Sequence, residues 1–538
     1  MADNQENWLK HLPKEILDGI QGNYLDSYMV ALEGWRRGLT LKWHIKDHEK
    51  FKDLKTWFVD EPGQLFSLSN GEKVHYFFRT RGDLITNEAV EIGKSKQKTK
   101  EYLEKANVKV PEGKEFNEES TIEEIKAYAE SLGYPVVVKP TDGSFGRGVY
   151  TNVLSDGELE FSVQNLREQL NTDRIIIEKY VDGEDFRLYV IENEVVGAMK
   201  RIPPNVVGDG KHTIRQLIEQ KNLIRQDNPR LINCQIKINN ELKDYIGRHN
   251  LSLDTVVEEG KQIFLSKKCN ISIGGDPIDV LNDISPDAKQ IAINALKAIP
   301  NMSHGAVDLM VDRNGQAYVI EVNATAQIGG LLFPIKGESR DIPSAIIDYY
   351  FPETKENKGN KSQMFFDFYD VLDPLFNHEA SSTTVTPAPL GKVFAKKYIV
   401  TGDVQNMGYH RGLRKQAFER ELHGYVMSVE DEGIEVVVAG LDPEMVDDFK
   451  NGLYEDPERS EVEEVREEPY DGFLNVGFEI KLDLKTQINE INDYKKQLER
   501  LDLEIKKEEK KRRKFKQSFS WKVSSPIRLF GAIVKRIK

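Results

Sequence analysis

The sequence GAVDLMVDRNGQAYVIEVNATAQIGG, from Gly305 to Gly330, decides the fold of this chain. It contains two strand-like runs, with Asp308 in the first and with Glu321 and Asn323 in the second. Because side chains alternate along a strand, Glu321 and Asn323 share one face. Oxygen-bearing side chains on paired strands suit Mg²⁺ when phosphate oxygens supply its remaining ligands. The pattern therefore predicts a magnesium site that a nucleotide completes.

A glycine-rich loop, KPTDGSFGRGV, follows a β-branched run and spans Lys139–Val149. Its glycines would let the backbone approach phosphate oxygens, whose charge the N–H groups can meet. These glycines are Gly143, Gly146 and Gly148. Lys139 can reach phosphates as a cation, and Lys96, ahead of a helix-like segment, is a second candidate. Taken alone the loop fits an ordinary turn equally well, but with the downstream carboxylates it predicts phosphate binding.

The segment IIIEKYVDGEDFRLYVI (Ile175–Ile191) predicts a nucleoside site. The stretch from Glu178 to Val181 reads as a short hinge, and the backbone of a hinge can pair with the edge of an adenine. Asp185 follows Glu178 by seven residues and can accept hydrogen bonds from ribose hydroxyls. Arg187 returns on the next strand, where it can face phosphate.

These residues resemble the ATP-grasp superfamily, and more closely the ATP-grasp domain of cyanophycin synthetases and glutathione-synthetase-like ligases. The resemblance covers residues 91–352. Its most specific motifs are KPTDGSFGRGV, PPNVVGDGKHTIRQLI (Pro203–Ile218), SIGGDPIDV (Ser272–Val280) and VIEVNATAQIGG. The resemblance implies that ATP lies between two α+β lobes. It also implies that a substrate carboxylate becomes an acyl phosphate, which an amine attacks to give an amide.

The same resemblance implies a role for each matching residue. Phosphates would be contacted by Lys96 and Lys139, adenine by Glu178 and Val181, and the ribose by Asp185. Phosphate or the acyl intermediate would be bound by Arg187 and Arg201. Two Mg²⁺ ions would be bound by Asp308, Glu321 and Asn323, and the substrate side would be lined by Gly274 and Gly275.

A second unit is predicted over residues 391–482, where strand-like and helix-like runs follow the β-α-β-β-α-β order of a ferredoxin-like sandwich. Within it, Thr401–Gly440 resembles acylphosphatase, whose signature is close to GxVQGVGFR followed by GWVxN. Here His410 stands at the position of the phosphate-binding Arg, and Ser428 at that of the Asn which orients water. We therefore predict a degenerate site with little acylphosphatase activity. A structural or partner-binding module is the alternative.

The predicted class is α+β and multidomain. The predicted order is an N-terminal α/β region (1–90), an ATP-grasp domain (91–352), a linker (353–390), an acylphosphatase-like domain (391–482), a coiled-coil-like helix (483–515) and a basic amphipathic tail (516–538). Apolar residues recur every seven positions in the helix, which allows oligomer contacts through it. These residues are Leu484, Ile491, Leu498 and Ile505.

The composition, 39% hydrophobic and 30% charged, is typical of a globular protein. The net charge is −14, yet from Lys506 to Lys538 there are 13 Lys and Arg against two Glu. A basic tail with an apolar stripe predicts contact with an anionic membrane surface, and its SFSW-x-V-x-SPIR pattern resembles tails of bacterial surface-polysaccharide glycosyltransferases. The acidic body argues against nucleic acid as a partner. The polar start predicts no secretory signal, so we expect a cytoplasmic protein, peripheral at the inner membrane face.

Three functions are consistent with the sequence. The favoured one is an ATP- and Mg²⁺-dependent carboxylate–amine ligase that acts on small molecules or peptides. The second is a phosphohydrolase of the acylphosphatase type, in which the large domain only binds nucleotide. The third is a scaffold joined through the helix and tail. The first is favoured because the metal- and phosphate-binding residue types are intact in the large domain and replaced in the small one.

Overall fold

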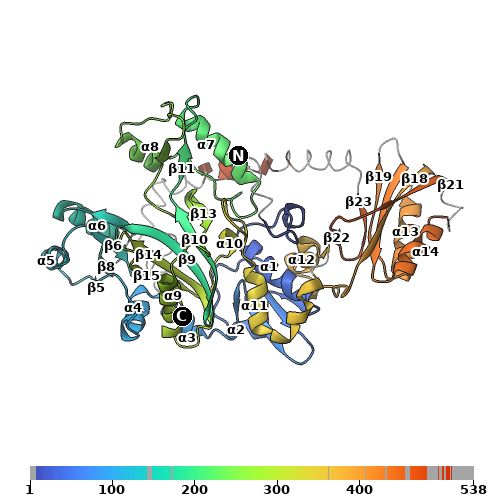
Figure 1. Ribbon diagram of the computed structural model, residues 1–538, viewed down its shortest axis with the longest axis horizontal. Helices are drawn as coiled ribbons and strands as arrows, with labels where there is room; N and C mark the ends of the chain where they lie inside the picture. The colour runs from blue at the N-terminus through green and yellow to red at the C-terminus, as the bar shows by residue number, and fades with distance from the viewer. Residues whose placement is uncertain are drawn as a thin grey trace. The chain divides into compact units, whose positions relative to one another are not determined.

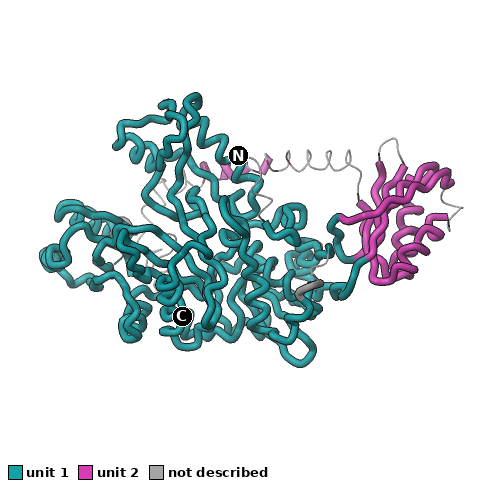
Figure 2. The backbone as a smooth tube through the Cα atoms, in the orientation of Figure 1, with its two compact units in different colours: residues 1–393, 472–476 teal, residues 394–471, 477–538 magenta. Residues whose placement is uncertain are grey.

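The structure is a computed structural model of the 538-residue chain. It describes residues 8–141, 148–170, 172, 174–360, 363–405, 407–429, 433–454 and 461–481, together with residues 495, 498, 500, 501, 504–508, 510 and 511. Two compact units result (Figure 2): unit 1 comprises Met1–Val393 with Gly472–Val476, and unit 2 comprises Phe394–Asp471 with Gly477–Lys538. Both mix helices and sheets, which confirms the α+β class. Within the described part of the chain, no helix is long and apolar enough to cross a bilayer.

Unit 1 is built on a five-stranded antiparallel sheet with the order β13-β10-β9-β14-β15 (Figure 1). Apolar side chains such as Leu188, Val190 and Val307 point from one face of this sheet into a core that helix α9 covers. Strand alternation therefore sends the intervening polar side chains to the opposite face. The elements are β9 (Gly183–Ile191), β10 (Glu194–Ile202), β13 (Asp276–Asp279), α9 (Pro286–Ala298), β14 (His304–Asp312) and β15 (Ala317–Asn323), with α3 (Asn87–Lys94) and α4 (Lys96–Lys105) beside β15.

A smaller four-stranded sheet with the order β5-β8-β6-β7 forms a lobe of unit 1. Helices α5 and α6 pack on it around a core that includes Val136, Val138 and Ile177. Helix α5 begins in a capping box, in which Thr121 and Glu124 bond each other's backbone N–H. The elements are β5 (Gly113–Phe116), α5 (Ile122–Leu132), β6 (Val136–Pro140), β7 (Tyr150–Val153), α6 (Asp156–Leu170) and β8 (Ile175–Lys179).

The N-terminal region forms a third sheet of unit 1, with the order β17-β1-β2-β3-β4. Helices α1 and α11 pack against each other, and α1 also packs on β1 and β2. The elements are a 3-10 helix (Lys14–Leu17), α1 (Asn23–Arg36), β1 (Thr40–His44), α2 (Glu49–Lys52), β2 (Leu65–Ser69), β3 (Val74–Phe78), β4 (Arg81–Gly82), α10 (Gly329–Leu332), α11 (Ile342–Tyr350) and β17 (Ser382–Thr384).

The stretch 353–390, which we expected to be a linker, is instead folded into unit 1. Its strand β17 pairs with β1, and Phe368 packs edge-on against Trp43 with ring centroids 5.4 Å apart. The polar segments at both ends suggested a linker, but the aromatic residues between them supply apolar area to bury. The elements are a 3-10 helix (Pro352–Asn360), β16 (Met364–Phe365), which pairs with β22 (Leu474–Asn475), and α12 (Phe368–Phe376).

An insertion between β10 and β13 forms a small subdomain with its own core, which includes Ile214, Ile218 and Ile246. Helix α7 begins in a second capping box, between Thr213 and Gln216. The elements are β11 (Asn205–Val207), α7 (Ile214–Gln226), α8 (Asn240–Gly247), β12 (Gln262–Phe264) and a 3-10 helix (Ile271–Ile273).

Unit 2 contains the four strands and two helices that were predicted, in the predicted order, and adds the strand β21, which the sequence analysis missed. Its sheet has the order β21-β18-β20-β19-β23, and α13 and α14 share a core with it. The elements are β18 (Phe394–Asp403), α13 (Met407–Glu419), β19 (His423–Val429), β20 (Gly433–Gly440), α14 (Pro443–Gly452), β21 (Glu461–Pro469) and β23 (Phe478–Lys481).

The coiled-coil-like helix and the basic tail lie almost wholly outside the described residues. In the part that is described, residues 504–508 are helical and Leu498 and Ile505 are exposed. The oligomer contact and the membrane contact therefore stay predictions.

Candidate functional site

A cluster of charged side chains occupies the sheet face opposite α9. Asp308 lies opposite Arg187 in the β14–β9 ladder, and the two form a bidentate pair, Nε to Oδ1 at 2.8 Å and Nη2 to Oδ2 at 2.9 Å. Arg201 reaches Asp308 from β10, Nη2 to Oδ2 at 3.0 Å, and its Nε lies 2.5 Å from Oδ1 of Asp185. Four of the predicted site residues thus form one connected network on three neighbouring strands.

The second predicted acid faces the first across the β14–β15 hairpin. Asp308 pairs in register with Glu321, and the register shifts immediately afterwards, so that Leu309 lies opposite Val319. This bulge lets Val319 and Val322 both enter the α9 core while Glu321 lies on the face of Asp308. Asn323 follows two residues later, on the same face as Glu321, as alternation predicts.

The pKa values of the two facing acids, Asp308 and Glu321, shift in opposite directions. Burial raises the pKa of Asp308, but Arg187 and Arg201 outweigh burial and hold this pKa at about 2. Burial and the nearby charge of Asp308 raise the pKa of Glu321, and Lys96 opposes that rise. Two neighbouring carboxylates, only one of which is fully compensated, form a site that an added cation would stabilise.

A second cluster lies in the smaller lobe, at strands β6 and β8. Lys139 and Glu178 are both buried, and Nζ lies 2.5 Å from Oε2. The Nζ of Lys100 donates to the carbonyl oxygens of Pro111 and Gly113 at 2.8 and 2.9 Å. Burial lowers the pKa of Lys100, and the charge of Glu178 opposes this, so Lys100 lies within electrostatic reach of Glu178. Lys100 and Lys139 are therefore two buried cations in one part of the lobe, and Glu178 acts on both of them.

Helix α4 connects the two clusters. Lys96 at its first position acts on Glu321, and Lys100, one turn later, acts on Glu178. Residues four apart on a helix share a face, with Cβ atoms about 5–6 Å apart. The larger sheet and the smaller lobe therefore present their charged residues to the same short helix.

The sequence analysis missed Lys100. The spacing of the two lysines could have identified it. Lys100 follows Lys96 by four residues in a segment that was predicted to be helical, and residues four apart on a helix share a face. Its burial, at 8% exposed, was not readable from the sequence.

The predicted nucleoside and loop residues are placed as follows. Val181 lies just beyond the end of β8, three residues after Glu178, and is half-buried. Gly148 has φ of +73°, and a Cβ there would come within 2.8 Å of Leu166 and Leu170 in α6, so this position requires glycine. Gly143 and Gly146 lie outside the described residues.

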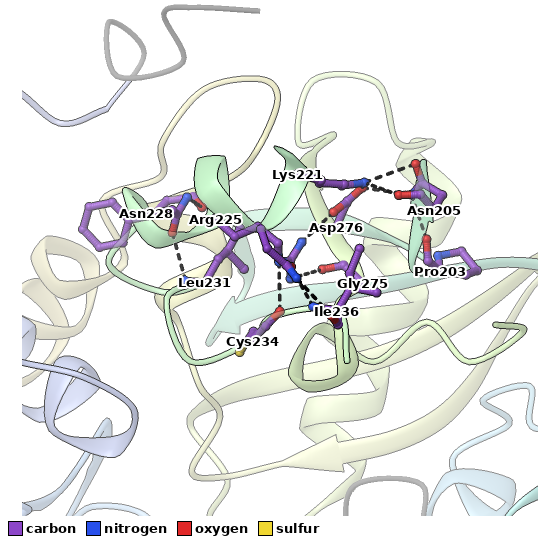
Figure 3. A network of polar contacts seen from close by, with 12 residues as sticks. Pro203, Asn205, Lys221, Arg225, Asn228, Leu231, Cys234, Ile236, Gly275 and Asp276 are labelled. Carbon is purple, nitrogen blue, oxygen red and sulfur yellow. Dashed lines mark hydrogen bonds and ion pairs between the residues drawn. The ribbon is translucent and has the colours of Figure 1, made fainter. Parts of the chain in front are cut away.

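Figure 3 shows a buried network that fixes the insertion to the site's edge strand. Asp276, the first residue of β13, accepts from Arg225 Nη1 at 2.8 Å, from Lys221 Nζ at 2.6 Å and from Asn205 Nδ2 at 2.9 Å. Arg225 is 1% exposed and also donates to the Gly275 carbonyl at 3.0 Å. Because β13 pairs with β10, this network sets the position of the strand end that carries Arg201.

The chain that returns from the insertion runs close to the charge cluster. A Cβ at Gly275 would lie 2.8 Å from the backbone oxygens of Cys269 and Asn270, so only glycine fits there. Burial raises the pKa of Cys269 to about 12, with Asp185 adding to the rise. Cys269 is therefore a protonated, unreactive thiol at neutral pH.

In unit 2 the two residues at the acylphosphatase signature positions differ in burial. His410 lies in α13 and is 2% exposed, and burial lowers its pKa. Ser428 lies near the end of β19 and is partly exposed. A neutral, buried imidazole cannot supply the positive charge of the Arg that the signature has at this position.

Two family models match this chain. The RimK-like ATP-grasp domain matches residues 93–227, and Acylphosphatase matches residues 396–480. The chain therefore carries an ATP-grasp domain followed by an acylphosphatase-like domain, as the sequence motifs predicted.

Curated relatives match about half of the chain. Cyanophycin synthetase of Crocosphaera subtropica is 31% identical over 277 residues, which is 49% of this chain and 31% of that protein. The glutathione biosynthesis bifunctional protein GshAB of Enterococcus faecalis is 31% identical over 315 residues, which is 56% of this chain and 41% of that protein. The chain thus spans less than half the length of either relative.

Among solved structures, a bifunctional glutathione synthetase from Pasteurella multocida matches with 26% identity and a TM-score of 0.43. The match covers 54% of this chain and 41% of that one.

Proposed function

We propose that this protein is an ATP- and Mg²⁺-dependent carboxylate–amine ligase that forms an amide through an acyl phosphate. The observation that carries the proposal is the arrangement around α4. One helix face places Lys96 near the facing acids of β14 and β15 and Lys100 near the buried pair of the smaller lobe. An ATP-grasp domain and relatives named as a synthetase and as a glutathione biosynthesis protein support the same function.

The facing carboxylates fit magnesium. Asp308 and Glu321 offer hard oxygen ligands from adjacent strands, and Asn323 adds an amide oxygen on the same face. The pKa of Glu321 is raised by burial and by Asp308, and this supports a cation as the ligand of the pair. When bound, magnesium would neutralise charge on the phosphate oxygens of ATP.

The chain's cations would then act on phosphate. Lys139 and Lys100 would meet the phosphates of ATP, and Glu178, which acts on both lysines, would help to keep them charged in the buried lobe. Arg187 and Arg201 lie beside the acids and would stabilise the charge that develops when a substrate carboxylate attacks the γ-phosphorus. The amine then attacks the acyl carbon and phosphate leaves. The chain needs no nucleophilic side chain of its own for either step.

Calorimetry with Mg–ATP and an ADP-release assay over amino acids and short peptides test this proposal together. We expect wild-type protein to bind Mg–ATP and to release ADP with at least one amine and carboxylate pair. Glu321→Gln should lower ADP release by at least about 10²-fold, because it removes a charged oxygen at the predicted metal.

Glu194→Gln is the matched control, because it makes the same chemical change at an exposed position of β10 in the same sheet. It should leave ADP release unchanged. Absence of Mg–ATP binding by the wild-type protein would refute the ligase proposal, and so would equal effects of the two variants.

A further inference from the structure

The loop that leaves β15 after Asn323 is held by three distant parts of unit 1. Thr80 Oγ1 donates to the Ala326 carbonyl at 3.0 Å from the β3–β4 turn, and the Ile328 N–H donates to Asp26 Oδ1 at 3.0 Å in α1. Arg230, from the insertion, donates to Gln327 Oε1 at 2.9 Å. The N-terminal region and the insertion therefore both contact the loop that begins just after the predicted metal ligand Asn323.

Arg79, in the β3–β4 turn, is an unexplained cation at this meeting point. It is 7% exposed, and its φ of +57° lies in the left-handed region. Its Nε donates to Gln64 Oε1 at 2.7 Å, but its Nη2 is buried without a hydrogen-bond partner among the described residues. The guanidinium of Arg79 also lies over the Phe78 ring, 4.8 Å from its centroid, so only Nη2 is left without a polar partner among the described residues. An added hydrogen-bond acceptor would satisfy this buried donor.

The groups around Arg79 contain more donors than acceptors. Burial raises the pKa of Asp26, and the charges of Arg230 and Arg79 partly oppose this rise, so both arginines lie near Asp26. Among the described residues, however, neither arginine is within ion-pair distance of Asp26. The hydroxyl of Thr325, two residues after Asn323, is also buried without a partner among the described residues. Arg79 and Thr325 each adjoin a residue of the Thr80–Ala326 hydrogen bond, so these two donors, which have no partner among the described residues, come together from separate elements and are suited to an added acceptor.

We propose that Arg79 and Thr325 bind an amino-acid or peptide substrate through a carboxylate group that takes no part in the reaction. This inference rests on the proposed ligase function. Two residues of extended chain span about 7 Å at most, so Thr325 lies within roughly the length of one amino acid from Asn323. A substrate held by its carboxylate at Thr325 thus places a neighbouring functional group beside the metal ligands.

A carboxylate fits better than a phosphate. Its two oxygens match the planar guanidinium, which donates through a fork of N–H groups. Its single charge is compatible with Asp26 nearby, whereas a doubly charged phosphate would be repelled more strongly. The lysines that suit phosphate lie instead at the other end of the site, on α4 and β6.

The experiment compares wild-type protein with Arg79→Gln, using the standard amino acids and their glycyl dipeptides, each as free acid and as C-terminal amide. In the ADP-release assay the wild type should prefer a free acid over its amide by at least about 10²-fold in kcat/KM, since a site built to pair a polar group rejects the analogue without it. Arg79→Gln should lower kcat/KM for the acid to nearly that for the amide. Arg79→Lys, which keeps the charge and loses the fork, should give an intermediate value.

Arg81→Gln, at the first residue of β4, is the matched control. Arg81 is fully buried, but its guanidinium donates to the Lys55 carbonyl, the Ile85 carbonyl and Asn87 Oδ1 at 2.8–3.0 Å. This variant should lose more thermal stability than Arg79→Gln and should keep the preference for the acid.

Two readouts separate this inference from the ligase proposal. Calorimetric binding of Mg–ATP should be the same in wild type and Arg79→Gln, and its absence from both would refute the ligase function. Without nucleotide, preferred free acids should raise the thermal midpoint of wild type but not of Arg79→Gln. Equal use of acids and amides, an unchanged preference in Arg79→Gln, or no midpoint shift with any free acid would overturn the carboxylate site.

Discussion

Each unit contains a buried titratable group, which is charged in unit 1 and neutral in unit 2. In unit 1, Asp308 is 5% exposed, and the bidentate Arg187 together with Arg201 holds its pKa at about 2. In unit 2, His410 is 2% exposed, and burial lowers its pKa. Burial discharges a group that has no strong partner, and it preserves the charge of a group whose partners are buried with it.

This contrast bears on which unit can do chemistry on phosphate. A phosphoryl group needs fixed positive charge around it, and unit 1 supplies arginines and lysines whose charges are balanced by buried acids. Unit 2 keeps the fold matched by the acylphosphatase model but has a neutral imidazole at the position that should be cationic. The fold of unit 2 does not depend on a charge at this position, because the core that holds the fold is apolar.

The largest effect on stability is expected when the carboxylate of Asp308, which pairs with Arg187 and Arg201, is removed. Asp308→Asn leaves two buried guanidinium groups without their shared acid, so the free energy of unfolding should fall by about 3–5 kcal/mol. Urea denaturation measures this loss. Asp287→Asn, at an exposed position in the first turn of α9, should cost less than about 1 kcal/mol.

The pH dependence of that difference sharpens the comparison. The pKa of Asp308 is lower in the folded protein than in the unfolded chain, so its stabilisation is complete above pH 4 and is lost as the pH falls towards 2. The stability gap between wild type and Asp308→Asn should therefore narrow from about pH 4 to about pH 2. A gap of constant size over this range would show that Asp308 is not held in its charged form.

An intermediate effect is expected for the lysine that the sequence analysis missed. Lys100→Met keeps the length of the side chain but removes the ammonium group beside Glu178, so the affinity for Mg–ATP should fall about 10- to 100-fold. Calorimetry measures the change. Lys105→Met, on the last turn of the same helix, is the control and should bind nucleotide like wild type. Equal affinities in all three proteins would exclude Lys100 from the nucleotide site.

The smallest effect is expected in unit 2. Without nucleotide, the full chain should hydrolyse acetyl phosphate at close to the uncatalysed rate, and His410→Ala should change that rate less than about twofold, since a neutral buried imidazole offers phosphate no charge. Release of inorganic phosphate measures this. If acetyl phosphate is hydrolysed well above the background rate and this activity disappears in His410→Ala or Ser428→Ala, the phosphohydrolase hypothesis would be supported instead.

Local sequence predicted much of the architecture. The β-α-β-β-α-β order of unit 2 and the facing strands that carry Asp308 and Glu321 follow from alternation and from the spacing of apolar runs. The stretch 353–390 was misread because polar segments at its ends outweighed the aromatic residues between them. Two of those aromatic residues, Phe366 and Phe368, are buried against Tyr28 of α1 and Trp43 of β1, more than 300 residues earlier in the chain.

By itself, the sequence determined which side chains share a face, since periods of 2 and 3.6 residues act within one element. Only the tertiary structure decided which faces meet: Arg187 with Asp308 at a separation of 121 residues, Lys139 with Glu178 at 39, and Thr80 with Ala326 at 246. Contacts at such separations depend on how sheets and helices pack, and no local period encodes that packing. For the same reason residues 1–90 looked uninformative as sequence, although the fold places Arg79 and Asp26 beside the loop that begins just after the predicted metal ligand Asn323.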